Sequence, residues 1–195
     1  MAVNLQKGQR IDLTKSNAGL KKVMVGLGWD EAPKKFSLFG GRTQDIDCDA
    51  VAIALTDDKI ASKDDVVFYN NLTHRSHCIL HQGDNLTGAG DGDDEQVLVY
   101  LSDLPQQYNK IVFAVTIYEA YKRNQSFGMI KNAFIRRVNS DNNQELCRFN
   151  LSDNYEGMTA MIFGELYRNN GEWKFNAVGE GTKDDGVSQL IKRFI

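Results

Sequence analysis

Residues 158–178 read MTAMIFGELYRNNGEWKFNAV, and this stretch indicates the fold class. Its two arms, 158–167 and 173–178, are rich in apolar and aromatic residues, and they flank the sequence Asn169-Asn170-Gly171. Asn and Gly accept the positive φ angles that a tight turn between antiparallel strands requires. The stretch therefore predicts a β-hairpin.

Similar short runs recur along the chain between turn-forming residues, and long helical periodicity is nearly absent. We expect further strands at residues 23–29, 46–55, 66–69, 78–81, 97–101, 111–118, 133–138 and 146–151. Many short strands at near-equal spacing favour two packed sheets. Residues 184–195 carry apolar side chains at helical spacing, which indicates an amphipathic helix. The predicted fold class is mainly β: a two-sheet β-sandwich with few short helices and a C-terminal amphipathic helix.

The composition indicates a globular protein, with 195 residues, 42% of them hydrophobic. We expect a single domain over residues 1–195. A net charge of −3 with scattered Lys and Arg disfavours nucleic-acid binding. No transmembrane segment or signal peptide is recognisable, so we expect a cytoplasmic protein. The three widely spaced cysteines, Cys48, Cys78 and Cys147, are expected to be reduced thiols.

An acidic, glycine-rich loop spans residues 83–95, which read GDNLTGAGDGDDE. It places five acidic side chains beside four glycines, and the chain has no Lys or Arg between Ser76 and Asn109. Like charges repel at short range, and a glycine-rich chain loses much entropy on ordering, so an ordered loop of this kind needs a bound cation. Its carboxylate, amide, hydroxyl and carbonyl oxygens suit Ca²⁺ or Mg²⁺ better than zinc or copper.

A second acidic group, Asp45, Asp47 and Asp49, alternates with Ile46 and Cys48. An EF-hand loop would need Gly at its sixth position and Glu at its twelfth, where this chain has Ala and Thr. We therefore reject the EF-hand. In an extended strand the three carboxylates share a face with residues 51, 53 and 55, so they would cap the end of a buried strand.

The two groups together predict a divalent metal site. The first candidate ligands are Asp47, Asp49, Asp84, Asp91, Asp93 and Asp94, and Asn85 and Glu95 follow them. Zinc is a weaker alternative, although all three histidines lie close to Cys78. His77 and His81 would share a face of an extended segment but lie about 13 Å apart, too far to hold one ion. A further alternative is that Cys48 and Cys78 meet in the fold and bind a soft metalloid.

Five ordered blocks of this sequence closely resemble the TerD family of bacterial tellurite-resistance and general stress proteins. The blocks are VGLGWD at 25–30, FYNNL at 68–72, the acidic loop with Gln96, NAFIR at 132–136 and FGELYR at 163–168. The match runs nearly from end to end, and residues 34–42 resemble the longer connection of TerZ-like members. The family pattern has an aromatic residue before the first Asp of the Asp-x-Asp pair and Leu within it, whereas this chain has Ile46 and Cys48.

This resemblance implies a β-sandwich that binds calcium, usually two ions, through acidic residues at one end. The matching positions are Asp47, Asp49, Asp84, Asn85, Asp91, Asp93, Asp94 and Glu95. It also implies a role in tellurite and general stress resistance, with other tellurite-resistance proteins as partners at the inner face of the membrane.

Three functions remain open at this point. The first is a non-catalytic calcium-binding stress protein that acts as a sensor, scaffold or regulator. The alternative is a two-metal-dependent hydrolase that uses the same acidic cluster. A third is a calcium-dependent contact with anionic lipid.

Overall fold

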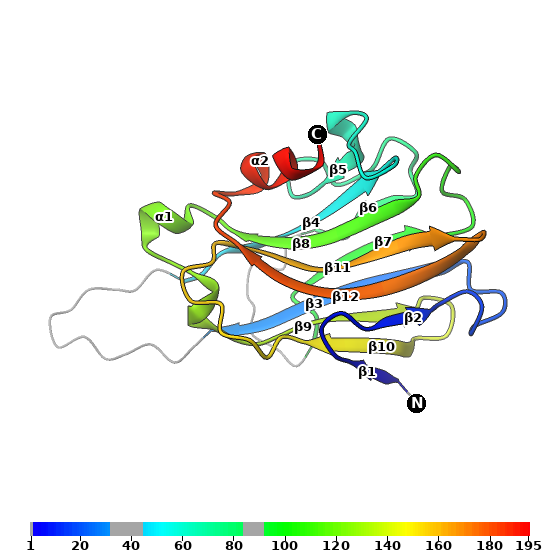
Figure 1. Ribbon diagram of the computed structural model, residues 1–195, viewed down its shortest axis with the longest axis horizontal. Coiled ribbons are helices and arrows are strands. Elements are labelled where there is room, and N and C mark those ends of the chain that lie inside the picture. Colours follow the sequence, from blue (N-terminus) through cyan, green and yellow to red (C-terminus); the bar gives the residue numbers. More distant parts are fainter. Residues whose placement is uncertain (1, 32–44, 84–91) are drawn as a thin grey trace, which may run out of the picture.

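Two β-sheets face each other in the computed structural model, which describes residues 2–31, 45–83 and 92–195 (Figure 1). Within these residues each sheet has six strands. Sheet A has the order β1 (Val3–Leu5), β10 (Gln144–Asn150), β9 (Ile130–Asn139), β3 (Lys22–Glu31), β7 (Glu95–Tyr100), β6 (Ile79–His81). Sheet B has the order β2 (Arg10–Asp12), β12 (Glu172–Thr182), β11 (Ala160–Asn169), β8 (Lys110–Ile117), β4 (Cys48–Leu55), β5 (Val66–Val67). The predicted mainly β fold of two packed sheets is confirmed.

The β11–β12 hairpin forms where the sequence predicts it. Antiparallel pairing ends at Asn169 and Glu172, so Asn170 and Gly171 form a two-residue loop. Their φ angles of 54° and 80° are positive, as a type I′ turn requires. All the other predicted strands also have counterparts, whereas β1 and β2 were not predicted. Each of these two is a three-residue edge strand, too short to give a periodic pattern.

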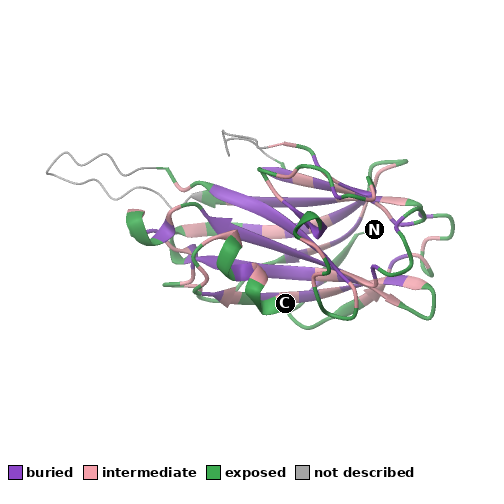
Figure 2. Ribbon diagram, turned by 90° about the horizontal axis from the view of Figure 1, so that it is seen from above, coloured by how far each residue is buried: buried purple, intermediate pink, exposed green. Residues whose placement is uncertain are grey.

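The main hydrophobic core lies between the sheets, as the buried inner strands in Figure 2 show. Side chains such as Val25 and Val97 of sheet A pack there with Phe113 and Phe163 of sheet B. Strand β4 is buried along its whole length because both of its faces are covered. Its alanines 50, 52 and 54 face the main core, and residues 51, 53 and 55 face a second apolar cluster on the outer side of sheet B.

The C-terminal segment covers that outer side of sheet B (Figure 1). It contains helix α2 (Val187–Leu190) and the 3₁₀ turn η3 (Ile191–Phe194), and Leu190 is fully buried. The helix is shorter than predicted because Gly186, with φ 74° and ψ −177°, cannot continue a helix toward Asp184. The other helical turns are η1 (Lys63–Asp65), α1 (Ala120–Arg123) and η2 (Phe127–Met129). Among the described residues, no helix is long and apolar enough to cross a membrane.

An arginine, Arg137, is enclosed in the core between the sheets. Its guanidinium carbon lies 3.0 Å from the centre of the Phe175 ring, and its Nη1 lies 3.7 Å from the Cys147 sulfur. Burial lowers the pKa of Arg137 to about 10. Its Nε and Nη2 have no hydrogen-bond acceptor within the described part of the chain, so this cation is only partly compensated.

Candidate functional site

Several strand ends meet at one corner of the sandwich, where β7 begins in sheet A and β4 begins in sheet B. We call five of the described carboxylates at this corner the acidic rim: Asp47, Asp49, Asp93, Asp94 and Glu95. Strand β5 pairs with β4 at Ala52 and Ile53, farther along the strand. The corner thus places the end of the acidic loop beside the Asp-x-Asp segment.

Glu95 joins the two sheets at this corner. Its Oε2 accepts a hydrogen bond of 2.6 Å from the backbone N–H of Ala50 and one of 3.0 Å from Nε2 of His81. The backbone N–H of Gly83 donates to Nδ1 of His81, so the ring carries its donated proton on Nε2. Glu95 and His81 are both buried. The first residue of β7 therefore fixes β4 and β6 in place.

Asp94 is held by an irregularity in β3. The register between β3 and β9 shifts between Gly28 and Asp30, which frees the backbone N–H of Trp29 from the ladder. That N–H donates to Oδ2 of Asp94 at 2.6 Å, and the N–H of Asp94 donates to the carbonyl of Leu27 at 2.8 Å. Backbone groups of the sequence block VGLGWD therefore hold Asp94 in place at the end of the acidic loop.

Burial raises the pKa of Asp94, because the charged carboxylate loses water there. The bond from Trp29 opposes this rise, while the nearby carboxylates of Asp30, Asp93 and Glu95 add to it. Asp30 itself accepts a hydrogen bond of 2.7 Å from Nδ2 of Asn132. The negative charge of these neighbours adds to the cost of charging Asp94, and a cation would offset that cost.

Asp93 lies on the outer face of sheet A. Arg136 forms a two-point contact with it, from Nε to Oδ1 at 2.6 Å and from Nη2 to Oδ2 at 3.0 Å. Gln96 donates to the same carboxylate at 3.2 Å. The Asp93 side chain is 0% exposed, and it occupies the space above Gly26, where a methyl group would clash with it. Ligation of a metal by Asp93 would require Arg136 to release it.

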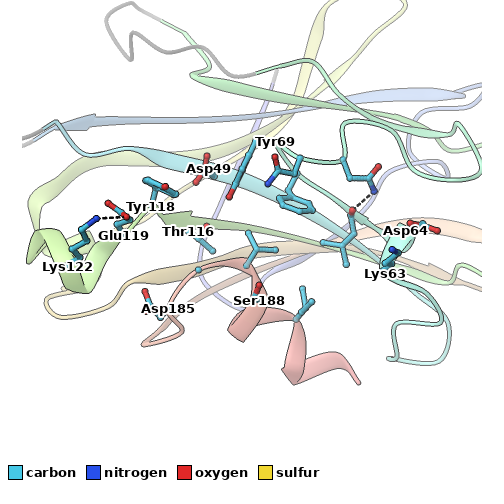
Figure 3. Close-up of a pocket in the computed structure, with 17 residues that line it drawn as sticks. Asp49, Lys63, Asp64, Tyr69, Thr116, Tyr118, Glu119, Lys122, Asp185 and Ser188 are labelled. Carbon is cyan, nitrogen blue, oxygen red and sulfur yellow. Dashed lines mark hydrogen bonds and ion pairs between the residues drawn. The ribbon is translucent and has the colours of Figure 1, made fainter.

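Asp49 lies on the outer face of sheet B. It alternates with Ala50 and shares its face with residues 51, 53 and 55, as the strand pattern predicts. Asp49 lines a groove with Tyr69 and Tyr118 (Figure 3). Asp47 precedes it with a side chain that is 47% exposed and has its Oδ2 3.9 Å from Nη1 of Arg123.

The acidic rim therefore has two parts on opposite faces of the sandwich. Stacked sheets lie about 10 Å apart, whereas calcium ligands lie about 2.3–2.6 Å from the ion, so one ion cannot bind both Asp49 and Asp93. The predicted ligands Asp84, Asn85 and Asp91 lie outside the described residues. In the ranges 2–31, 45–83 and 92–195, no three His, Cys, Asp or Glu side chains are grouped so as to hold a metal ion. The predicted ligand roles stay predictions.

The donor chemistry of the rim fits a hard cation. Every predicted side-chain ligand offers oxygen, and oxygen donors suit Ca²⁺ or Mg²⁺. With Asp94 in place, the remaining ligands would have to come from the adjoining residues 84–91.

Among the described residues the histidines form no zinc cluster. His81 is bonded to Glu95, and His74 lies in a separate buried group with Nε2 3.2 Å from Oδ1 of Asp65. Tyr108 donates to the same Asp65 oxygen at 2.8 Å. Cys48 is buried at the start of β4 in sheet B, and Cys78 is buried directly before β6 of sheet A.

Sequence reasoning missed two residues of this corner, Asp30 and Arg136. Asp30 directly follows a predicted strand, and an acidic residue at the end of a strand could have been selected from the sequence as a candidate site residue. Arg136 alternates with the apolar Ile135 on a predicted strand, which indicates an outward side chain. The pairing of Arg136 with Asp93 depends on the order of strands in sheet A, which the pattern does not give.

Comparison with known proteins matches residues 1–194 to the TerD domain family model. The stress response protein SCP2 of Bacillus subtilis (strain 168) is 48% identical over 199 residues, covering 100% of both chains. The tellurium resistance protein TerD of Serratia marcescens is 48% identical over 182 residues, covering 93% of this chain and 91% of its own. The tellurium resistance protein TerZ of the same organism is 36% identical over 200 residues. A crystal structure of a homologue of telluride resistance protein (TerD) from Streptomyces coelicolor A3(2) superposes with a TM-score of 0.64 at 24% identity, over 87% of this chain and 95% of its own.

Proposed function

Because this chain belongs to the TerD family of tellurium resistance and general stress proteins, we propose that it is a non-catalytic stress protein that binds calcium at the acidic rim. The observation that carries the proposal is the buried carboxylate of Asp94 at the end of the acidic loop, directly between Asp93 and Glu95. Burial of a charged carboxylate is unfavourable and a cation would offset it, and the adjoining residues 84–91 add further oxygen donors.

The ligands in this proposal form two groups. Asp94 and Glu95, with Asp84, Asn85, Asp91 and a released Asp93, would serve the sheet A side, and Asp47 and Asp49 would serve the sheet B side. Their separation on two faces supports two ions. Calcium bound there would supply positive charge and fix the end of the acidic loop.

Glu95 can transmit the effect of calcium binding to both sheets. Glu95 holds the backbone of Ala50 in sheet B and the ring of His81 in β6, so any shift of the loop end acts on both sheets. This arrangement suits a sensor, scaffold or regulator, in which a local change of charge alters a surface that partners recognise.

The physiological setting of the proposal is tellurite and general stress resistance, because curated relatives carry those names. The partners would be other tellurite-resistance proteins, met in the cytoplasm at the inner face of the membrane. The three cysteines, all among the described residues, are buried and form no disulfide, which is compatible with such a reducing compartment. No observation favours the hydrolase alternative, which would need an acid or base beside the metal. In the described residues His81 is hydrogen-bonded to Glu95, and the buried His74 is hydrogen-bonded to Ser76 and lies 3.2 Å from Asp65.

Thermal melting of metal-stripped protein tests this proposal. Binding to the folded state alone adds about 2.7 kcal/mol when free calcium is 100 times the dissociation constant. For a chain of this size we expect the melting temperature to rise by about 5–11 °C. The Asp94→Asn variant should lose the part of the rise that comes from the ion on the sheet A side, and Asp141→Asn, in the turn between β9 and β10, should keep the whole rise. An unchanged wild-type melting temperature in millimolar calcium would overturn the proposal.

A further inference from the structure

A groove with a volume of about 820 Å³ lies on the outer side of sheet B (Figure 3). Its walls come from three segments: residues 63–71, residues 116–122 and residues 185–191. Small-molecule sites have volumes of about 300–1,000 Å³ and combine an apolar lining with a few polar groups. This groove has the size and the mixed lining of such a site.

Two tyrosines stand beside a nearly buried carboxylate at the groove. Tyr69 and Tyr118 are 40% and 42% exposed, and Asp49 lies next to them (Figure 3). The pKa of Tyr69 is raised by burial and then by Asp49, Tyr118 and Asp47, so these groups influence one another. The Tyr118 ring already has the Arg123 guanidinium 4.9 Å from its centre. Aromatic rings beside carboxylates attract organic cations.

Negative charge is distributed around the groove. Four carboxylates, those of Asp49, Asp64, Glu119 and Asp185, line it against the two ammonium groups of Lys63 and Lys122. Glu119 is paired with Lys122 at 2.8 Å and lies 3.5 Å from Arg123, so the excess negative charge comes from the three aspartates. Between the charged groups the lining mixes apolar side chains, such as Val66, Val187 and Ile191, with polar ones such as Asn70 and Ser188. A ligand that fits must therefore carry separated positive charges on an apolar chain.

We infer that the groove binds a small aliphatic polyamine, a flexible methylene chain with two or more ammonium groups. The ammonium groups would meet the carboxylates and tyrosine rings, and the methylene groups would lie on the apolar lining. Asp49 is also a proposed calcium ligand, whereas Asp64 and Asp185 belong to no predicted calcium ligand set. Polyamine binding through Asp64 and Asp185 therefore does not depend on the calcium proposal.

Calorimetric titration of the full chain with spermidine tests the inference, in calcium-saturated buffer at physiological ionic strength. We expect saturable binding and none of octanediol, an uncharged chain of similar length. Tyr69→Leu should weaken binding about threefold to tenfold because the ring is lost, and Tyr69→Phe should bind within about twofold of the wild type. Equal binding by Tyr69→Leu and the wild type would overturn the inference.

Charge variants separate the groove from general attraction to an acidic protein. The double variant Asp64→Asn with Asp185→Asn should weaken spermidine binding several-fold. Asp103→Asn with Asp141→Asn changes the net charge equally, at exposed turns beyond the far ends of β7 and β9, and should have little effect. Equal weakening by both pairs, or loss of binding when calcium is added, would contradict the inference. Tighter binding of an acetylated trilysine amide than of spermidine would contradict the assignment to a small molecule.

Discussion

Replacing Glu95 with Ala removes the acceptor that joins the two sheets at the acidic rim. In the wild type a single oxygen, Oε2, receives both the Ala50 N–H at 2.6 Å and the His81 Nε2–H at 3.0 Å. Glu95, Ala50 and His81 are all buried, so water does not replace the lost acceptor. Glu95→Gln is the matched control, because one amide oxygen in the same place can accept both bonds.

The expected cost follows from these contacts. Each buried donor left without an acceptor costs about 1–3 kcal/mol, so the two donors of the Ala variant give about 2–6 kcal/mol. Relief of the repulsion between Glu95 and Asp94 offsets part of this. We expect a net loss of about 3 kcal/mol in the free energy of unfolding, or about 6–12 °C in melting temperature. The Gln variant should lose about 1 kcal/mol, since hydrogen bonds to a charged acceptor are stronger than those to a neutral one.

Guanidinium unfolding followed by tryptophan fluorescence measures both variants, with a chelator present so that metal binding does not contribute. Trp29 lies at the acidic rim and Trp173 near the opposite end, so the two probes cover the sandwich. Equal costs for the two variants, or a loss below about 1 kcal/mol for Glu95→Ala, would refute the bridging role of this carboxylate.

Four further predictions concern the same sheets. Arg137→Met should stabilise the protein by about 1–4 kcal/mol in denaturant unfolding, because an uncompensated buried cation is replaced by an apolar side chain. The substitution Arg136→Met should instead lower the free energy of unfolding by about 1–3 kcal/mol, because it removes the arginine that pairs with the buried Asp93 side chain. Gly26→Ala should cost about 1–3 kcal/mol and weaken calcium binding in calorimetry, because the new methyl group displaces Asp93. In calcium-free buffer, Asp94→Asn should be at least as stable as the wild type at neutral pH. The pKa of Asp94 is raised in the folded state, so the wild type gains stability as the pH falls from that raised pKa toward the ordinary carboxyl pKa. In this pH range the stability advantage of the Asn variant should shrink, and thermal melts at several pH values measure it.

The sequence predicts most strands because their signals are local. Asn170 and Gly171 specify a turn by themselves, and the alternation in β4 places Asp49 on the correct face of its strand. The same local signals fail for three-residue edge strands such as β1, whose position depends on its partner β10.

The candidate site was less predictable, because it depends on contacts between distant segments. The sequence shows that residues 93–95 are acidic, but not their partners. In the structure Asp93 accepts hydrogen bonds from Arg136, Asp94 accepts one from Trp29, and Glu95 accepts one from Ala50. These three pairings follow from the strand order in sheet A and from the irregularity at Trp29. Periodicity also gives no reason to expect a buried cation at Arg137.

Isothermal titration calorimetry of metal-stripped protein with calcium chloride tests the central claim most directly. The account predicts saturable binding of two ions per chain, with dissociation constants of about 10⁻⁷ to 10⁻⁵ M. Asp94→Asn should weaken this binding, and Asp141→Asn should leave it unchanged. Absence of saturable heat up to millimolar calcium, or equal binding by wild type and Asp94→Asn, would contradict it.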